Sequence, residues 1–126
     1  ALAVAKYLEQ NDKVAYVNYC GLENDKYHAL AEKYLPNGSC GVVSFGVKGG
    51  RKAAEEFMKH LKLGSIETHV ADARTCCLHP ASATHRQMND EELTACGVYP
   101  DLVRYSCGLE DAEDLIADLE QAFAQI

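Results

Sequence analysis

The chain has 126 residues, of which 48% are apolar and 25% are charged, and its formal net charge is −7 with a sequence pI near 5.1. These values fit one folded domain and argue against a nucleic acid or an anionic membrane as partner, because both require clustered Lys and Arg. No apolar run reaches the roughly 18 residues of a membrane span and no signal-peptide pattern opens the chain, so we expect a cytoplasmic protein.

The first half of the sequence predicts three helices and two strands. The opening helix pattern has no N-cap residue, so we expect this helix to continue from a longer protein. Asp25 is expected to cap the second helix, which is amphipathic with Tyr27, Leu30, Ala31 and Tyr34 on its apolar side. In chain order we expect a helix from Leu2 that stops at residues 10–12, a strand at Val14–Tyr19, the helix after Asp25, a strand at Cys40–Val47 and a helix at Arg51–Leu63.

The second half predicts two short strands, a helix, a further strand and a closing helix. The acidic residues between Glu110 and Glu120 are expected to form a solvated helix face. We expect a strand at Ser65–Ala71, an apolar run at Thr75–Pro80, a polar loop at Ala81–Met88, a helix capped by Asn89 and ended by Gly97, a strand that contains Arg104, and a closing helix over residues 109–126. This order predicts an α+β fold with one mostly antiparallel sheet of four to five strands, covered by helices on one face.

The six cysteines do not form a CxxC pair, which excludes zinc-ribbon and thioredoxin patterns. Several of them lie inside apolar strand patterns, and Cys76 and Cys77 are adjacent, so they point to opposite faces of any strand. We expect free and mostly buried thiols.

Two segments carry residues that could bind a ligand, and each has a structural alternative. Lys48 and Arg51 flank two glycines between a strand and a helix, which is typical of a phosphate site or of a tight turn with positive φ. The segment matches neither common phosphate-loop motif, which favours the turn. His79 and His85 lie on one loop without a third metal ligand, so we expect hydrogen-bonded or surface histidines and no metal site.

Arg104 stands among strand-forming residues in the run "DLVRYSCGLED". An arginine is seldom buried without a partner, and its fork suits a carboxylate in two-point contact. Two interpretations follow from the residues alone. Arg104 forms an ion pair with a neighbouring acid of the chain, or it binds an anionic group beyond the strand.

Four segments of the sequence resemble, in the right order, the C-terminal domain of the Cys/Met-metabolism family of pyridoxal-phosphate (PLP) enzymes. They are "VNYCGL", "FGVKGG", "HPASATHRQM" and "PDLVRYSCGLEDAEDLIADLEQAF". The resemblance implies that residues 1–126 form the small C-terminal domain of a fold-type-I enzyme, usually a homotetramer, whose N-terminal PLP-binding domain is absent here. It therefore implies no catalytic, cofactor-binding or metal-binding residue in this chain, and none of its eight lysines is expected to hold the cofactor.

Within this family, the motifs are most similar to those of the O-acetylhomoserine sulfhydrylases. The resemblance then implies that the full-length enzyme makes homocysteine from O-acetylhomoserine and sulfide, and that the present chain alone is inactive. Two alternatives stay open. The protein could be a cystathionine γ-synthase-type or γ-lyase-type member of the family, or a non-catalytic α+β module for binding or oligomerisation.

The resemblance also implies two contacts to the small amino-acid substrate. The family's arginine in the pattern LVR-x-S-x-G-x-E binds the substrate's α-carboxylate, and this position is Arg104. A Ser or Asn of the family makes a second contact, and here His69 in "THVADA" stands at that position. Ala71 is a further departure, because glycine is usual there.

Overall fold

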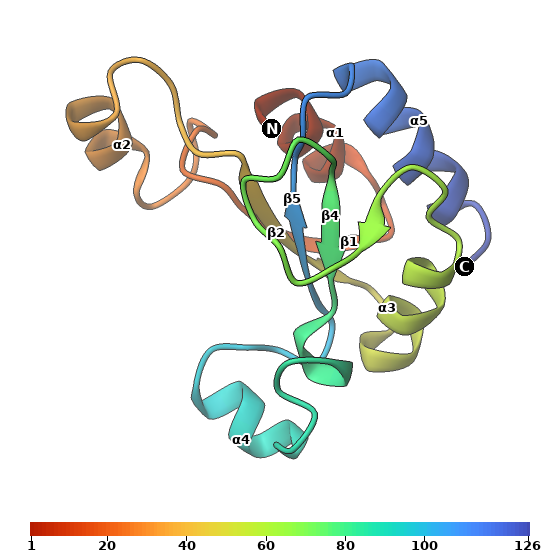
Figure 1. The fold of residues 1–126 in the computed structure, drawn as a ribbon. Coiled ribbons are helices and arrows are strands. Elements are labelled where there is room, and N and C mark those ends of the chain that lie inside the picture. The colour runs from red at the N-terminus through yellow and green to blue at the C-terminus, as the bar shows by residue number, and fades with distance from the viewer.

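Five strands form one mixed sheet in the computed structural model, which describes all residues from 1 to 126 (Figure 1). The strand order is β1-β2-β5-β4-β3, and only the short outer pair β3 and β4 runs parallel. The mostly antiparallel α+β sheet predicted from the sequence is confirmed. The strands are β1 (Val14–Asn18), β2 (Val42–Val47), β3 (Ser65–Ile66), β4 (Cys76–Leu78) and β5 (Leu102–Ser106).

Three of the five helices, α1, α3 and α5, pack side by side on one face of the sheet, whereas α2 and α4 lie beyond its ends (Figure 1). No helix is both long and apolar enough to cross a membrane. The helices are α1 (Leu2–Gln10), α2 (His28–Tyr34), α3 (Gly50–Lys59), α4 (Asp90–Ala95) and α5 (Ala112–Phe123), and a 3₁₀ turn, η1, covers Pro80–Ser82.

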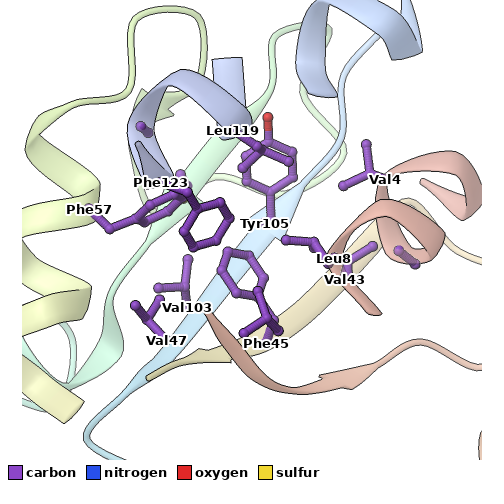
Figure 2. Packing of buried hydrophobic residues seen from close by; sticks show 14 of the residues in the cluster. Val4, Leu8, Val43, Phe45, Val47, Phe57, Val103, Tyr105, Leu119 and Phe123 are labelled. Atoms are coloured by element: carbon purple, nitrogen blue, oxygen red, sulfur yellow. The ribbon is translucent and has the colours of Figure 1, made fainter. Parts of the chain in front are cut away.

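The core lies between the sheet and these three helices (Figure 2). Phe45 of β2, Phe57 of α3 and Phe123 of α5 meet at its centre, with ring centroids 4.4 to 6.1 Å apart. Val103 and Tyr105 of β5 are fully buried in the same cluster. Because side chains alternate along a strand, the residue between them must point to the opposite face, which no helix of the core covers.

The prediction for α2 was wrong in two respects. The helix starts at His28, and Asp25 accepts the N–H of Tyr27 at 2.8 Å in the turn before it, so Asp25 does not cap the helix. Of the four apolar residues expected on its buried side, only Ala31 is buried, whereas Tyr27, Leu30 and Tyr34 are more than half exposed. The amphipathic pattern is real, but the rest of this chain does not cover it.

The strand predicted at Ser65–Ala71 is also shorter than expected. β3 ends at Ile66, and the segment from Glu67 to Arg74 is irregular. It crosses back to β4 near the face of the sheet that lacks helices. The capping of α4 is as predicted, because Asn89 and Glu92 form a reciprocal capping box with two 2.9 Å hydrogen bonds.

All six cysteines are free, but the expectation that most are buried was wrong. Cys76 and Cys77 are buried in β4, and burial raises the pKa of both thiols. Of the remaining four, two are partly exposed and two are exposed: Cys20, Cys107, Cys40 and Cys96.

Asp118 departs from the solvated acidic face predicted for α5. Its side chain is buried, and its carboxylate accepts the backbone N–H groups of Lys62, Leu63 and Gly64 at 2.8 to 2.9 Å. The amide of Gln121 donates to the same carboxylate at 3.0 Å. Asp118 therefore closes the turn that joins α3 to β3.

Candidate functional site

Arg104 lies in the middle of β5 on the face of the sheet opposite the core. Its strand neighbours in register are Ser44 of β2 and Leu78 of β4. The alternation described above fixes this orientation, because Val103 and Tyr105 are both held in the core. Arg104 is half-buried and projects from the central strand of the sheet.

The guanidinium of Arg104 is held by backbone carbonyls and not by a carboxylate. Its Nη2 donates to the carbonyl oxygen of Thr68 at 2.7 Å and to that of His69 at 3.4 Å. No Asp or Glu of the chain lies within ion-pair distance of it. The interpretation of Arg104 as an ion pair with a neighbouring acid is therefore wrong for this chain.

The Nε–H of Arg104 is buried and has no acceptor among the atoms of the chain. A buried donor without an acceptor costs free energy, and such a group is often completed by a ligand. A cation without a counter-charge and with an unused donor suits an anion. The arrangement can therefore bind a carboxylate.

His69, the second predicted contact, hydrogen-bonds to Arg104 only through its main chain. Its imidazole is two-thirds exposed and lies 3.6 Å from the carboxylate of Glu67. Only its carbonyl oxygen contacts the guanidinium. The structure thus brings the two predicted residues together, but only the main chain of His69 hydrogen-bonds to Arg104.

Ala71 is the only residue other than glycine with positive φ, at 56°. This left-handed conformation explains why glycine suits the position, since a Cβ atom strains it. Its N–H donates to the hydroxyl of Ser106 at 3.2 Å, which ties the loop to β5.

We expect Ala71→Gly to raise the free energy of unfolding by about 0.5–1 kcal/mol, because glycine removes the strain and only part of this gain is lost to a more flexible unfolded chain. Urea unfolding measures the change. Ala73→Gly is the matched control in the same exposed loop. Its φ is not positive, so the glycine there should destabilise the protein. Equal effects at the two positions would contradict the assignment of strain to Ala71.

The end of β5 is held by a network around Thr75, which is fully buried. The carboxylate of Glu110 accepts the N–H of Thr75 at 2.8 Å and its hydroxyl at 2.7 Å, and that hydroxyl accepts the N–H of Gly108 at 2.9 Å. A Cβ atom on Gly108 would lie 2.5 Å from the carbonyl oxygen of Ala73, so only glycine permits this close approach. Glu110 is therefore a structural acid and not part of a solvated face.

Glu110 should make stability depend on pH. Partial burial acts to raise the pKa of its carboxyl, but the hydrogen bonds from Thr75 outweigh burial and lower the pKa below the ordinary value of 4.5. A lowered folded-state pKa stabilises the protein above the ordinary value, and this contribution is lost as the pH falls through the folded-state pKa. We expect Glu110→Gln to be less stable at pH 7 and to lose less stability than the wild type between about pH 5 and 3. Urea unfolding at a series of pH values measures both, and parallel curves would contradict this role of Glu110.

The glycine turn before α3 is structural, as predicted. Gly49 and Gly50 have φ of 103° and 74°. Lys48 donates to the carbonyl of Asp12 at 2.7 Å. Arg51 donates to the carbonyl of Ala81 at 2.9 Å and pairs with the carboxylate of Asp90, so it joins this turn to η1 and α4. Both cationic side chains therefore have hydrogen-bond partners within the chain.

The two histidines of the next loop are hydrogen-bonded, as predicted. His79 is buried, and its two ring nitrogens lie 2.8 Å from the hydroxyl of Ser82 and 2.7 Å from the carbonyl of Pro100. Because a carbonyl only accepts, Nε2 of His79 donates to Pro100, and the hydroxyl of Ser82 also lies 3.4 Å from the carbonyl oxygen of His79. His85 is paired with its neighbour Thr84 at 2.9 Å.

Two features of the site were missed from the sequence. Ser106 lies two residues after Arg104 and so on the same face of β5, which the alternation of a strand could have revealed. The carbonyl of Thr68 could not have been found in this way, because a backbone acceptor leaves no trace in the residue type.

Comparisons with known proteins agree with this architecture. Residues 1–124 match the family model of the Cys/Met metabolism PLP-dependent enzymes. The chain is 48% identical to the homocysteine synthase of Schizosaccharomyces pombe over 97% of its own length and 28% of that protein. It is 42% identical to the O-acetyl-L-homoserine sulfhydrylase of Leptospira meyeri over 100% of its length and 29% of that protein.

A solved structure from Campylobacter jejuni shares the fold with a TM-score of 0.90 at 36% identity, over 98% of this chain and 30% of that one. That protein is assigned as an O-acetylhomoserine (thiol)-lyase and contains N'-pyridoxyl-lysine-5'-monophosphate at position 205. The chain thus spans less than a third of the length of these relatives. By its sequence over nearly its whole length, the chain belongs to the family of Cys/Met metabolism PLP-dependent enzymes.

Proposed function

We propose that residues 1–126 are the small C-terminal domain of an enzyme that makes homocysteine from O-acetylhomoserine and sulfide. In this enzyme, Arg104 binds the α-carboxylate of the amino-acid substrate. The observation that carries the proposal is the half-buried guanidinium, which has no acid partner and has an Nε–H without an acceptor. The identity of 42–48% to a homocysteine synthase and an O-acetyl-L-homoserine sulfhydrylase supports the choice of reaction.

The lysines of the chain do not fit the cofactor. Seven of the eight are exposed on the surface, and the eighth, Lys13, is half-buried with its ammonium on the terminal carbonyl of Ile126. A lysine that bonds covalently to PLP needs a site sheltered from solvent, which none of them has. We therefore assign PLP to residues outside this chain, where it supplies the electron sink. The residues present here bind and orient the substrate.

For His69 we propose a contribution through its main chain. Its carbonyl helps to hold Arg104, and its exposed imidazole is free to turn toward the substrate only if it leaves Glu67. By resemblance to the family, we also propose a homotetramer in the cytoplasm as the full-length form.

The full-length protein should be assayed with O-acetylhomoserine and sulfide, and homocysteine is the expected product. Replacing sulfide by cysteine tests for cystathionine formation by a γ-synthase, and release of 2-oxobutanoate from cystathionine tests for a γ-lyase. The 126-residue chain incubated with PLP is the control and should show neither stoichiometric cofactor absorbance after dialysis nor turnover. A full-length protein without cofactor absorbance would refute the enzyme and favour a binding or oligomerisation module.

A further inference from the structure

The segment of residues 68–72 is attached to the sheet by only two side chains. Both belong to β5 and both lie on its face away from the core: Arg104 and Ser106. No backbone hydrogen bond joins residues 68–72 to any strand. Backbone hydrogen bonds hold its two ends, from Glu67 to the carbonyl of Cys77 and from Leu109 to the carbonyl of Ala73, so the path between these ends depends on the two side chains.

The two attachments act on neighbouring points of the segment. Ser106 Oγ accepts the N–H of Ala71 at 3.2 Å and holds it in its left-handed conformation. The carbonyls of Thr68 and His69, a few residues earlier, accept from Nη2 of Arg104. Without the first attachment, the strained backbone can relax and the two carbonyls lose their fixed direction.

The direction of these carbonyls sets the direction of the guanidinium. An arginine side chain has several rotatable bonds, and hydrogen bonds from one nitrogen to two carbonyls restrict rotation about them. Nη2 carries two N–H groups, so while one donates to Thr68 the other remains for a two-point contact with a carboxylate together with a second nitrogen, and fixing Nη2 aims the fork. A donor aimed before binding loses less entropy when the ligand arrives.

We propose that Ser106 is a positioning residue for the substrate carboxylate. It acts through the loop, because its hydroxyl fixes Ala71 and thereby the carbonyls that aim Arg104. The role in catalysis rests on the proposed function, whereas the chain of contacts lies entirely within these 126 residues.

The kinetic test is Ser106→Ala in the full-length enzyme. Loss of one neutral hydrogen bond should raise KM for O-acetylhomoserine about three- to tenfold. Because Arg104 should bind the carboxylate equally well in the ground state and in the transition state, kcat should stay within about twofold of the wild-type value. Ser44→Ala is the matched control. Ser44 faces Arg104 across β2 and β5, but its hydroxyl contacts Asn18 and not the loop, so KM should not change.

A second measurement reports on the guanidinium without any turnover. In the 126-residue chain, NMR should resolve separate Nη–H signals for Arg104, identified by their loss in Arg104→Lys, because the carbonyls slow its rotation. Ser106→Ala should average these signals, and Ser44→Ala should not.

Two results would overturn the positioning role of Ser106 even if the enzyme makes homocysteine. One is averaged Nη–H signals of Arg104 in the unchanged chain, and the other is a KM of Ser106→Ala within about twofold of the wild-type value. A different result would refute Arg104 as the carboxylate ligand: its Nη–H signals are separate, but the Arg104→Lys substitution leaves KM unchanged. The proposed function would then fail, and the substrate role of Ser106 with it.

Discussion

Asp118→Ala should lower the free energy of unfolding by about 3–4 kcal/mol, a large effect for the loss of one polar side chain. Its carboxylate accepts three backbone N–H groups of the turn between α3 and β3, and alanine would leave these donors without an acceptor. Hydrogen bonds to a charged group are worth about 1.5–3 kcal/mol each, but bonds to one carboxylate share their effect and do not add fully.

Urea unfolding of the 126-residue chain measures this loss, with an unchanged m value as the sign that the folded state stays compact. Glu120→Ala is the matched control on the same helix. The side chain of Glu120 is exposed and accepts no hydrogen bond, so its loss should change stability by less than about 0.5 kcal/mol. Similar losses for the two variants would show that Asp118 is an ordinary surface acid.

Arg104→Lys should lower kcat/KM for O-acetylhomoserine about ten- to a hundredfold in the full-length enzyme. Lysine keeps the charge but cannot form the two-point contact, so one charge-assisted hydrogen bond of about 1.5–3 kcal/mol is lost. Arg104→Ala should cost more, because the carboxylate would then have no counter-charge. Steady-state kinetics of the purified variants measure both effects.

Stability and bound cofactor are the controls for these variants. Arg104 makes no ion pair within the chain and does not belong to the core, so both variants should fold and retain PLP. A large loss of stability with nearly normal kcat/KM per folded molecule would mean that Arg104 serves the fold and not the substrate.

The parts of the fold that were predictable from the sequence are those set by local chemistry. Alternation along β5 places Val103 and Tyr105 in the core and Arg104 on the other face. The paired glycines before α3 and the capping box of Asn89 likewise depend on residues only a few positions apart. Such features leave a signal in the order of the residues.

The errors concern partners that are distant in sequence. The apolar residues of α2 predict a buried face, yet whether a face is covered depends on what packs against it, and nothing in this chain does so. In the sequence, Asp118 looks like the other acids of α5. It becomes a buried hydrogen-bond acceptor only because the α3–β3 turn, more than fifty positions away in the sequence, packs against it.

The candidate site likewise combines features that the local sequence predicts with features that depend on distant residues. The pattern around Arg104 predicts a cation in a strand, and the structure places it in the middle of β5 and adds that its own chain supplies no acid for it. The carbonyls of the loop that hold its Nη2 follow from the irregular course of residues 67–74, whose first part, to Ala71, was predicted as a strand. A backbone conformation such as that of Ala71 has no signal in the residue type when the residue is alanine.

The most direct test of Arg104 as the carboxylate ligand compares two inhibitors of the full-length enzyme that differ only in that group. L-Norvaline carries the α-carboxylate, and butylamine is the same molecule without it. Arg104→Lys should raise the inhibition constant of L-norvaline about tenfold and leave that of butylamine within about twofold of the wild-type value. An equal change for both inhibitors, or no change for either, would contradict the assignment.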